Sequence, residues 1–200
     1  MSRGIGYTDA GQAFPIYITV VAGLLFLALA YFAVGQAAAT RNEAQTAADA
    51  AALAAALETR DRLTDEWVAN IQDPETWQDI FEGNAPVPDG CWRAHELAAR
   101  NDANVECQPD GPLGYTVVAE TNGTVGDTIV PGTENLKATE PATAVIEARC
   151  SFEEPAEEEE ADDETLPKLS CDDGEEWDLE PDDLANLPKP EDLFDVHLAD

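Results

Sequence analysis

The sequence predicts an α+β protein in which one N-terminal membrane-spanning helix continues into a long alanine-rich helix and then a small, disulfide-stapled α+β domain with an acidic tail. Three observations lead to this fold class. Residues 10–40 contain no charged side chain, four cysteines follow this stretch, and the second half alternates helix-like and strand-like apolar patterns.

The uncharged stretch has the length of a membrane span. Its core, residues 16–34, is almost entirely apolar. A hydrocarbon layer of roughly 30 Å requires about 20 such residues in a helix, because lipid offers no partner for unpaired backbone groups. We therefore expect a transmembrane helix over 13–36, with Pro15 in its first turn, where proline costs little.

A cleavable signal peptide is the alternative interpretation. Arg3 could serve as its basic start, and Ala37, Ala38 and Ala39 offer a small-residue cleavage site. However, the apolar core is longer than the usual signal core of about 7–15 residues. Residues 37–63 also continue as strong helix formers without glycine or proline. The sequence therefore favours an uncleaved anchor followed by an alanine-rich helical stalk over 37–63.

The orientation of the span does not follow from its flanking cations. Arg3 precedes it, while Arg41 and Arg60 follow, so the positive-inside rule gives no clear answer. The N-terminal flank, 1–12, is short, and the C-terminal part carries all four cysteines. We expect a single-pass protein of the plasma membrane, with residues 1–12 in the cytoplasm and the C-terminal domain outside.

The charge is strongly and unevenly acidic. The formal net charge is -32, which excludes a nucleic-acid-binding protein, because polyanions repel such a surface. Residues 151–200 hold 21 of the 42 carboxylates. The run Glu153–Glu164 predicts a solvated acidic linker over 153–170, with a cation-binding role as the alternative. A calcium loop centred on Gly174 fails, because Leu169 and Cys171 would occupy ligand positions.

The four cysteines are Cys91, Cys107, Cys150 and Cys171. None forms a C-x-x-C motif and no histidine lies at zinc-finger spacing, so we expect no metal cluster. An even count in an exported domain predicts disulfides, with three pairings possible. Cys91–Cys107 and Cys150–Cys171 are favoured, because each closes a short loop and would contribute about 3 kcal/mol.

The α+β domain is expected over 64–152. Two short helices over 64–83 are interrupted at Asp73-Pro74, and a third begins at Cys91 and is ended by Asn101 or Asn104. Strands are expected at 104–108, 114–121, 124–130 and 143–150, giving a three- or four-stranded antiparallel sheet. The tail, 171–200, is apolar enough to dock partly on this domain. The side chains expected to face inward are Trp67, Ile71, Trp77, Ile80 and Phe81.

No catalytic motif is recognisable, so we expect a non-enzymatic protein without a cofactor or a small-molecule substrate. His95 and His197 lack a serine or cysteine partner in a nucleophile setting, and His95 should be exposed. No phosphate-binding glycine motif or H-E-x-x-H sequence occurs. The sequon Asn122-Gly123-Thr124 reads equally well as a hairpin turn.

The N-terminal third resembles the TadE/TadG-like family, single-pass pilin-like proteins of Tad (Flp-type) pilus assembly and secretion systems. The resemblance covers about residues 9–57 and extends weakly to the Asp-Leu-Phe-x-Val-x-Leu-Ala-Asp tail. It is closest to actinobacterial TadG-related proteins. It implies membrane lipid and other pilin-like or Tad-system proteins as partners of the N-terminal helix. Ala44, Ala48, Ala51 and Ala55 share one face of this helix, and such small residues would let neighbouring helices approach closely. The matching residues are Gly11, Gln12, Pro15, Arg41, Ala44, Gln45, Ala47, Ala48, Asp49, Ala50, Ala51, Ala52, Leu53, Ala54 and Ala55.

One position departs from processed pilins. A glutamate is expected five residues after the cleavage glycine, but counting from Gly11 this position is Ile16. The chain is therefore expected to remain unprocessed. The expected function is a non-enzymatic, membrane-anchored component of a Tad-type pilus or secretion apparatus. The alternatives are a membrane-tethered acidic surface module that binds cations, cell-wall polymer or protein, and a secreted protein, possibly hydrolytic.

Overall fold

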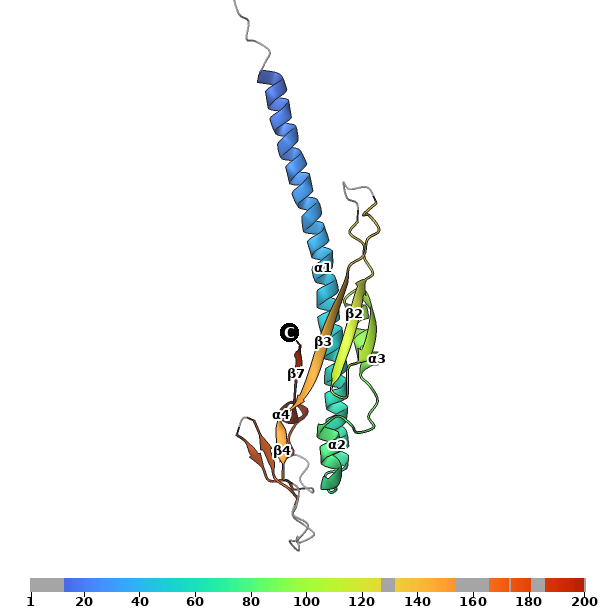
Figure 1. The fold of residues 1–200 in the computed structure, drawn as a ribbon, viewed down its shortest axis with the longest axis vertical. Helices are drawn as coiled ribbons and strands as arrows, with labels where there is room; N and C mark the ends of the chain where they lie inside the picture. The colour runs from blue at the N-terminus through green and yellow to red at the C-terminus, as the bar shows by residue number, and fades with distance from the viewer. Residues whose placement is uncertain (1–12, 127–131, 154–165, 173, 181–185, 200) are drawn as a thin grey trace, which may run out of the picture.

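A long helix and an antiparallel sheet packed against its C-terminal half form the molecule (Figure 1). The computed structural model describes residues 13–126, 132–153, 166–172, 174–180 and 186–199. A second, smaller sheet lies at the end of the molecule away from the N-terminal half of the helix. This arrangement confirms the expected fold class of an apolar N-terminal helix followed by a small α+β domain with two disulfides.

Helix α1 spans Ala13–Ala69, 57 residues, without interruption. Its length is about 85 Å at 1.5 Å per residue. The expected domain boundary between residues 63 and 64 is therefore wrong, because the helix continues for more than a turn beyond it. The chain breaks where proline requires it. The short helices η1 (Pro74–Thr76) and α2 (Trp77–Phe81) follow Asp73.

The alanine-rich stalk expected over 37–63 is also wrong, because from Thr40 onward α1 is the central helix of the folded domain. The small alanine side chains allow the sheet to pack directly on the helix. Helix α1 contacts β2 and β3 extensively. The alanines of this buried face are Ala44, Ala47, Ala48, Ala51, Ala52, Ala54, Ala55 and Ala56.

The main sheet has four antiparallel strands in the order β1-β2-β3-β7. They are β1 (Ala103–Pro109), β2 (Gly114–Thr121), β3 (Thr139–Ala148) and β7 (Phe194–Leu198). Alternate residues of each strand face α1, as expected for a sheet with one covered face. Val117, Ala144 and Ile146 are buried on that face.

The fourth strand is not the one expected. Residues 124–126 are not in a strand, and 127–130 lie outside the described residues. The tail supplies β7 instead, which pairs with β3 from Ala144↔Leu198 to Ala148↔Phe194. The tail that was expected to dock partly on the domain therefore contributes an edge strand to the sheet. Leu193 and Phe194 are fully buried within the core.

Helix α3 (Cys91–Arg100) packs between α1 and β1. It ends at Asn101, one of the two residues expected to end it, and Ala94 and Ala98 form its buried face. The Cys91–Cys107 disulfide ties the start of α3 to β1. His95 is exposed, as expected.

The smaller sheet consists of β4 (Cys150–Phe152), β5 (Leu169–Cys171) and β6 (Glu176–Trp177). Cys150 and Cys171 face each other across β4 and β5 and form the second disulfide. Both pairings favoured from the sequence are therefore present. The short helix α4 (Pro190–Leu193) leads the chain back to β7.

An aromatic cluster joins the smaller sheet to the rest of the core. The Phe152 ring lies edge-on to Trp77, with 5.3 Å between centroids, and Trp77 lies edge-on to Trp67. Phe81 stacks on Phe194 at 5.3 Å. The five side chains expected to face inward from 64–83 are all buried. The expected cytoplasmic segment 1–12 and most of the acidic linker, 154–165, lie outside the described residues.

Candidate membrane anchor and its junction with the folded domain

The N-terminal half of α1 extends from the folded domain as a free-standing apolar helix (Figure 1). Within the part of the chain that the structure describes, one helix, Phe14–Ala69, is long and apolar enough to cross a membrane, and its most apolar window is not buried by the rest of the chain. Its large exposed side chains are Phe14, Ile16, Tyr17, Ile18, Val20, Leu24, Leu25, Phe26, Leu27, Leu29, Tyr31, Phe32 and Val34.

The uniform exposure of this segment distinguishes it from an ordinary core helix. A helix that is apolar on every side must be buried, either in a protein core or in a membrane. Phe14–Val34 contains no charged residue and spans about 30 Å at 1.5 Å per residue, the thickness of a hydrocarbon layer. The segment is therefore a candidate membrane anchor by length, composition and exposure.

The junction between anchor and domain lies at Thr40 and Arg41, without a linker. Thr40 is 8% exposed, the first buried residue of α1 counted from the N-terminus of the described chain. The Arg41 guanidinium pairs with the Glu140 carboxylate near the start of β3. Gln45 donates to Asp49 Oδ1 at 2.7 Å and reaches the Pro141 carbonyl at 3.4 Å. These contacts fix the helix to the sheet within about three turns of the end of the span at Val34.

A buried hydrogen-bond network holds the middle of α1 to both other layers. The Thr59 and Tyr115 hydroxyls lie 2.7 Å apart, and the Gly90 backbone N–H donates to the Tyr115 hydroxyl at 3.1 Å. Gly90 also packs directly on the backbone of Ala55. A Cβ built on Gly90 would lie 2.0 Å from the Ala55 carbonyl oxygen. Glycine is required here for close approach.

The residues of the family motif fall into two groups. Gly11 and Gln12 lie outside the described residues. Pro15 is exposed in the first turn of α1, and its carbonyl accepts a hydrogen bond from Thr19. The second half of the motif, from Arg41 to Ala55, lies inside the folded domain. Ala50 and Leu53 are half-buried and the other motif alanines are buried.

This placement corrects one expectation about the motif. The alanine face had been expected to let neighbouring helices approach closely. In the structure, Ala44, Ala48, Ala51 and Ala55 are fully buried against this chain's own strands and α3. They are therefore unavailable to a partner helix, and contacts of that kind fall to the exposed residues 14–39.

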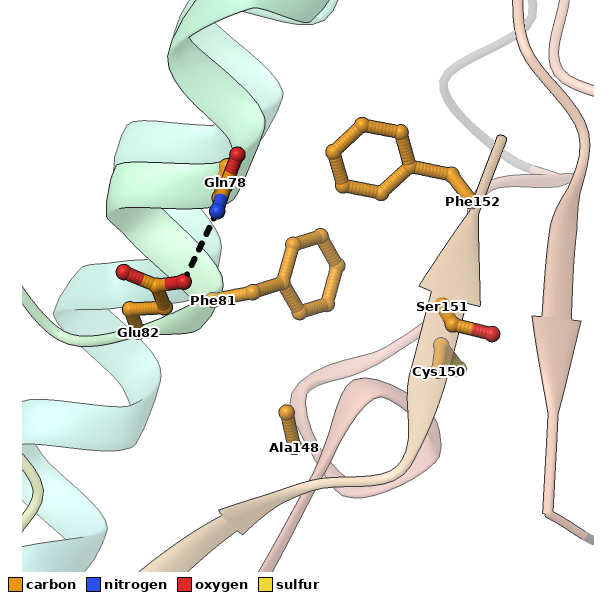
Figure 2. A pocket seen from close by; sticks show the side chains of 7 residues that line it. All are labelled: Gln78, Phe81, Glu82, Ala148, Cys150, Ser151 and Phe152. Atoms are coloured by element: carbon orange, nitrogen blue, oxygen red, sulfur yellow. Dashed lines mark hydrogen bonds between the residues drawn. The ribbon is translucent and has the colours of Figure 1, made fainter. Parts of the chain in front are cut away.

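A separate cleft of about 390 Å³ opens between α2 and β4. Figure 2 shows Phe81 and Phe152 facing each other across it, from α2 and β4, and Gln78 donating to Glu82 at 2.9 Å on its rim. Ala148, Cys150 and Ser151 complete the lining. The cleft lies where the smaller sheet joins the domain, far along the chain from the motif residues.

Sequence reasoning missed the contacts that connect distant segments. Arg41 and Glu140 are 99 positions apart, and Thr59 and Tyr115 are 56 apart. Among the features that were missed, the edge strand β7 had a local signal in the sequence. Its apolar residues Phe194, Val196 and Leu198 alternate with Asp195 and His197. In the structure the His197 ring lies 3.0 Å from the carboxylate of its near neighbour Asp195.

Comparison with known proteins identifies the N-terminal region. Residues 11–58 match the family model Tad, described as putative Flp pilus-assembly TadE/G-like. No curated protein and no solved structure matches the chain. The matched region covers the exposed apolar half of α1 and the buried alanine face that follows it.

Proposed function

Because this chain carries the TadE/G-like region of a Flp pilus-assembly protein, we propose that it is a non-enzymatic, membrane-anchored, pilin-like component of a Tad-type pilus or secretion apparatus. The observation that supports this most directly is the coincidence of the match, residues 11–58, with the exposed apolar helix and its junction with the domain. Its partners are other pilin-like or Tad-system proteins that contact residues 14–39 within the bilayer.

The proposed orientation places the N-terminus in the cytoplasm and the folded domain outside. Its support is the pair of disulfides, Cys91–Cys107 and Cys150–Cys171. Disulfides persist in oxidising compartments and are rare in the cytosol. The N-terminal flank, 1–12, is also short, whereas the C-terminal part carries all four cysteines.

The proposal is tested by exchanging the surface of the anchor while its length is kept. In the full chain, residues 14–34 are replaced by an unrelated leucine and alanine span of the same length. If the helix surface recognises its partners, cross-linked partners in the host membrane are lost, while flotation with the membrane is retained. If the helix is only a tether for an acidic surface module, the partners are retained and the proposal is wrong.

A matched control addresses the domain. Glu→Gln exchange over 153–160 lowers the acidity but leaves the anchor intact, and we expect the cross-linked partners to remain. A truncated chain beginning at Thr64 is unsuitable, because it would remove Leu63 and the buried alanines of α1 from the core.

A further inference from the structure

We propose that the connection between β2 and β3 rests in the lipid headgroup layer of the membrane that α1 enters, with Leu136 as its apolar contact. The proposal concerns the described residues of this connection, 122–126 and 132–138. The proposal rests on α1 being the membrane anchor. It goes beyond the anchor because it assigns a second, separate part of the chain to the bilayer surface.

Contacts between α1 and the sheet establish the direction of the connection. Arg41 pairs with Glu140, whereas Thr59 bonds to Tyr115, whose partner in the sheet is Ala144. Increasing residue number along β3 therefore moves away from the span, as it does along α1. Residues before Glu140 in β3 lie toward the membrane. Figure 1 shows the connection extending beyond the sheet in the direction of the N-terminal half of α1.

The connection also reaches far enough. Beyond Glu120 and Thr139 the two arms stay paired through Thr121 N–H to the Ala138 carbonyl, at 3.0 Å, and Val125 N–H to the Leu136 carbonyl, at 2.9 Å. Five residues from Glu120 to Val125 extend up to about 16 Å at 3.3 Å per residue.

The rise of α1 between its contact with the sheet and the end of the apolar span is shorter than this reach. From Arg41 back to Val34 it rises only about 10 Å at 1.5 Å per residue. For a span that ends near Val34, the headgroup layer, roughly 5–7 Å thick, lies about 3–10 Å from Arg41 toward the N-terminus, which is within the reach of the Val125–Leu136 pair.

The described surface of the connection suits an interface of water and lipid. The Leu136 side chain is 53% exposed, although hydrogen bonds of its own N–H and carbonyl hold its backbone in place. Lys137 pairs with Glu120 at 2.8 Å, and Glu134 accepts from the Gly132 N–H at 2.9 Å. The Lys137–Glu120 pair therefore carries no net charge, whereas Glu134 keeps its charge and its carboxylate is held by the Gly132 N–H.

The arrangement of charge along the molecule agrees with this seating. The smaller sheet, whose segment 151–180 carries the densest acid, lies at the opposite end (Figure 1). Lys168, one of only two cations in 151–200, is already paired with Asp178 at 2.6 Å. With the N-terminal half of α1 in the bilayer, the smaller sheet lies away from the membrane and the β2–β3 end lies nearest to it.

The test places a nitroxide label on an added cysteine in the full chain, reconstituted in phosphatidylcholine vesicles that contain a small fraction of nickel-chelating lipid. No free cysteine is present in the described protein, so the added thiol is the reactive one. The reporters are L136C and T124C in the connection. The matched control is L57C, also an exposed leucine, which lies about 24 Å further along α1 than Arg41.

We expect the headgroup-bound nickel to relax the nitroxide at L136C and T124C at least threefold more strongly than at L57C. Equal relaxation at all three sites, in protein that floats with the vesicles, would overturn the headgroup contact and leave the anchor intact. Failure of the protein to float would overturn the anchor and the contact together. The two failures are therefore distinguishable, and T124C serves if substitution of Leu136 itself removes the contact.

Discussion

At the scale of single residues, the buried alanines mark where the candidate anchor ends and the folded domain begins. Ala48 and Ala51 are fully buried against the sheet, whereas Ala37 and Ala38, about three to four turns earlier on the same helix, are exposed. The residue type is the same, but the environment differs. The effect of a larger side chain on stability therefore distinguishes the buried part of α1 from the exposed part.

We expect A48L and A51L to destabilise the folded domain by about 1–3 kcal/mol each, because extra methylene groups in a packed core force neighbouring atoms to move. In a chain of this size this lowers the melting temperature by several degrees. A37L is the matched control and should leave the melting temperature unchanged. Thermal unfolding of the three variants in detergent checks this, and an equal response at Ala37 and Ala48 would contradict the boundary at Thr40.

The Gly90 position is constrained by space rather than by backbone angle. We expect G90A to destabilise the domain by more than about 1 kcal/mol, because the new Cβ would collide with the Ala55 carbonyl and displace α3 from α1. G123A is the control, since no atom lies within 4 Å of its added Cβ. Urea unfolding compares the two variants, and a neutral G90A would mean that α3 shifts at little cost.

At the scale of elements, the two disulfides stabilise different parts of the fold. Cys91–Cys107 joins α3 to β1 within the main domain, where α1 and the sheet also hold them. Cys150–Cys171 holds a sheet whose three strands have only three, three and two residues. A small sheet with so few backbone pairs is marginal without a covalent link.

We therefore expect the double variant C150S/C171S to lose amide protection in β5 and β6 while β2 and β3 keep theirs. The expected local loss is about 3 kcal/mol, the chain entropy that the bond removes from the open state. Hydrogen exchange resolves the two regions. Simultaneous loss of protection in β2 and β3 would show instead that the smaller sheet is part of one cooperative unit with the core.

At the scale of the whole molecule, α1 is shared by the candidate anchor and the folded domain, so proteolytic cleavage near their junction would affect both. Thr40 is buried and the helix continues through it into the core, so a cut after Ala39 would fall in the turn that joins anchor and domain. Ile16 also stands where processed pilins have glutamate. We expect the chain to remain intact in the membrane fraction. Intact-mass measurement checks this, and a mature N-terminus at Gln12 or Thr40 would contradict it.

The acidic run 153–164 gives a prediction about the molecule's solubility. Exchange of its glutamates for glutamine should leave the melting temperature nearly unchanged, because exposed charges contribute little individually. Solubility at low salt should decrease, because net charge keeps acidic molecules apart. A rise in melting temperature with millimolar calcium, absent from the exchanged variant, would instead favour a cation site.

The sequence by itself determined the features that are local in the chain. The uncharged stretch 10–40 predicts a helix, the alternation in 114–121 predicts a strand, and Asp73-Pro74 predicts a break, because each depends on neighbouring residues alone. The disulfide pairings could also be predicted from the sequence, since the short loop that each pair closes favours it. The family motif, in the region later matched at 11–58, was likewise a local signal.

Only the tertiary structure decided what the alanine-rich helix does. Alanine favours a helix equally in a solvated stalk and against a sheet, so Ala44–Ala56 could not reveal the partner. That partner comes from segments far along the chain, including β3 and the terminal strand β7. The cost of closing such long loops is met by packing that no local pattern encodes. For the same physical reason, the contact between Arg41 and Glu140, which lie 99 positions apart, could not be predicted from the sequence.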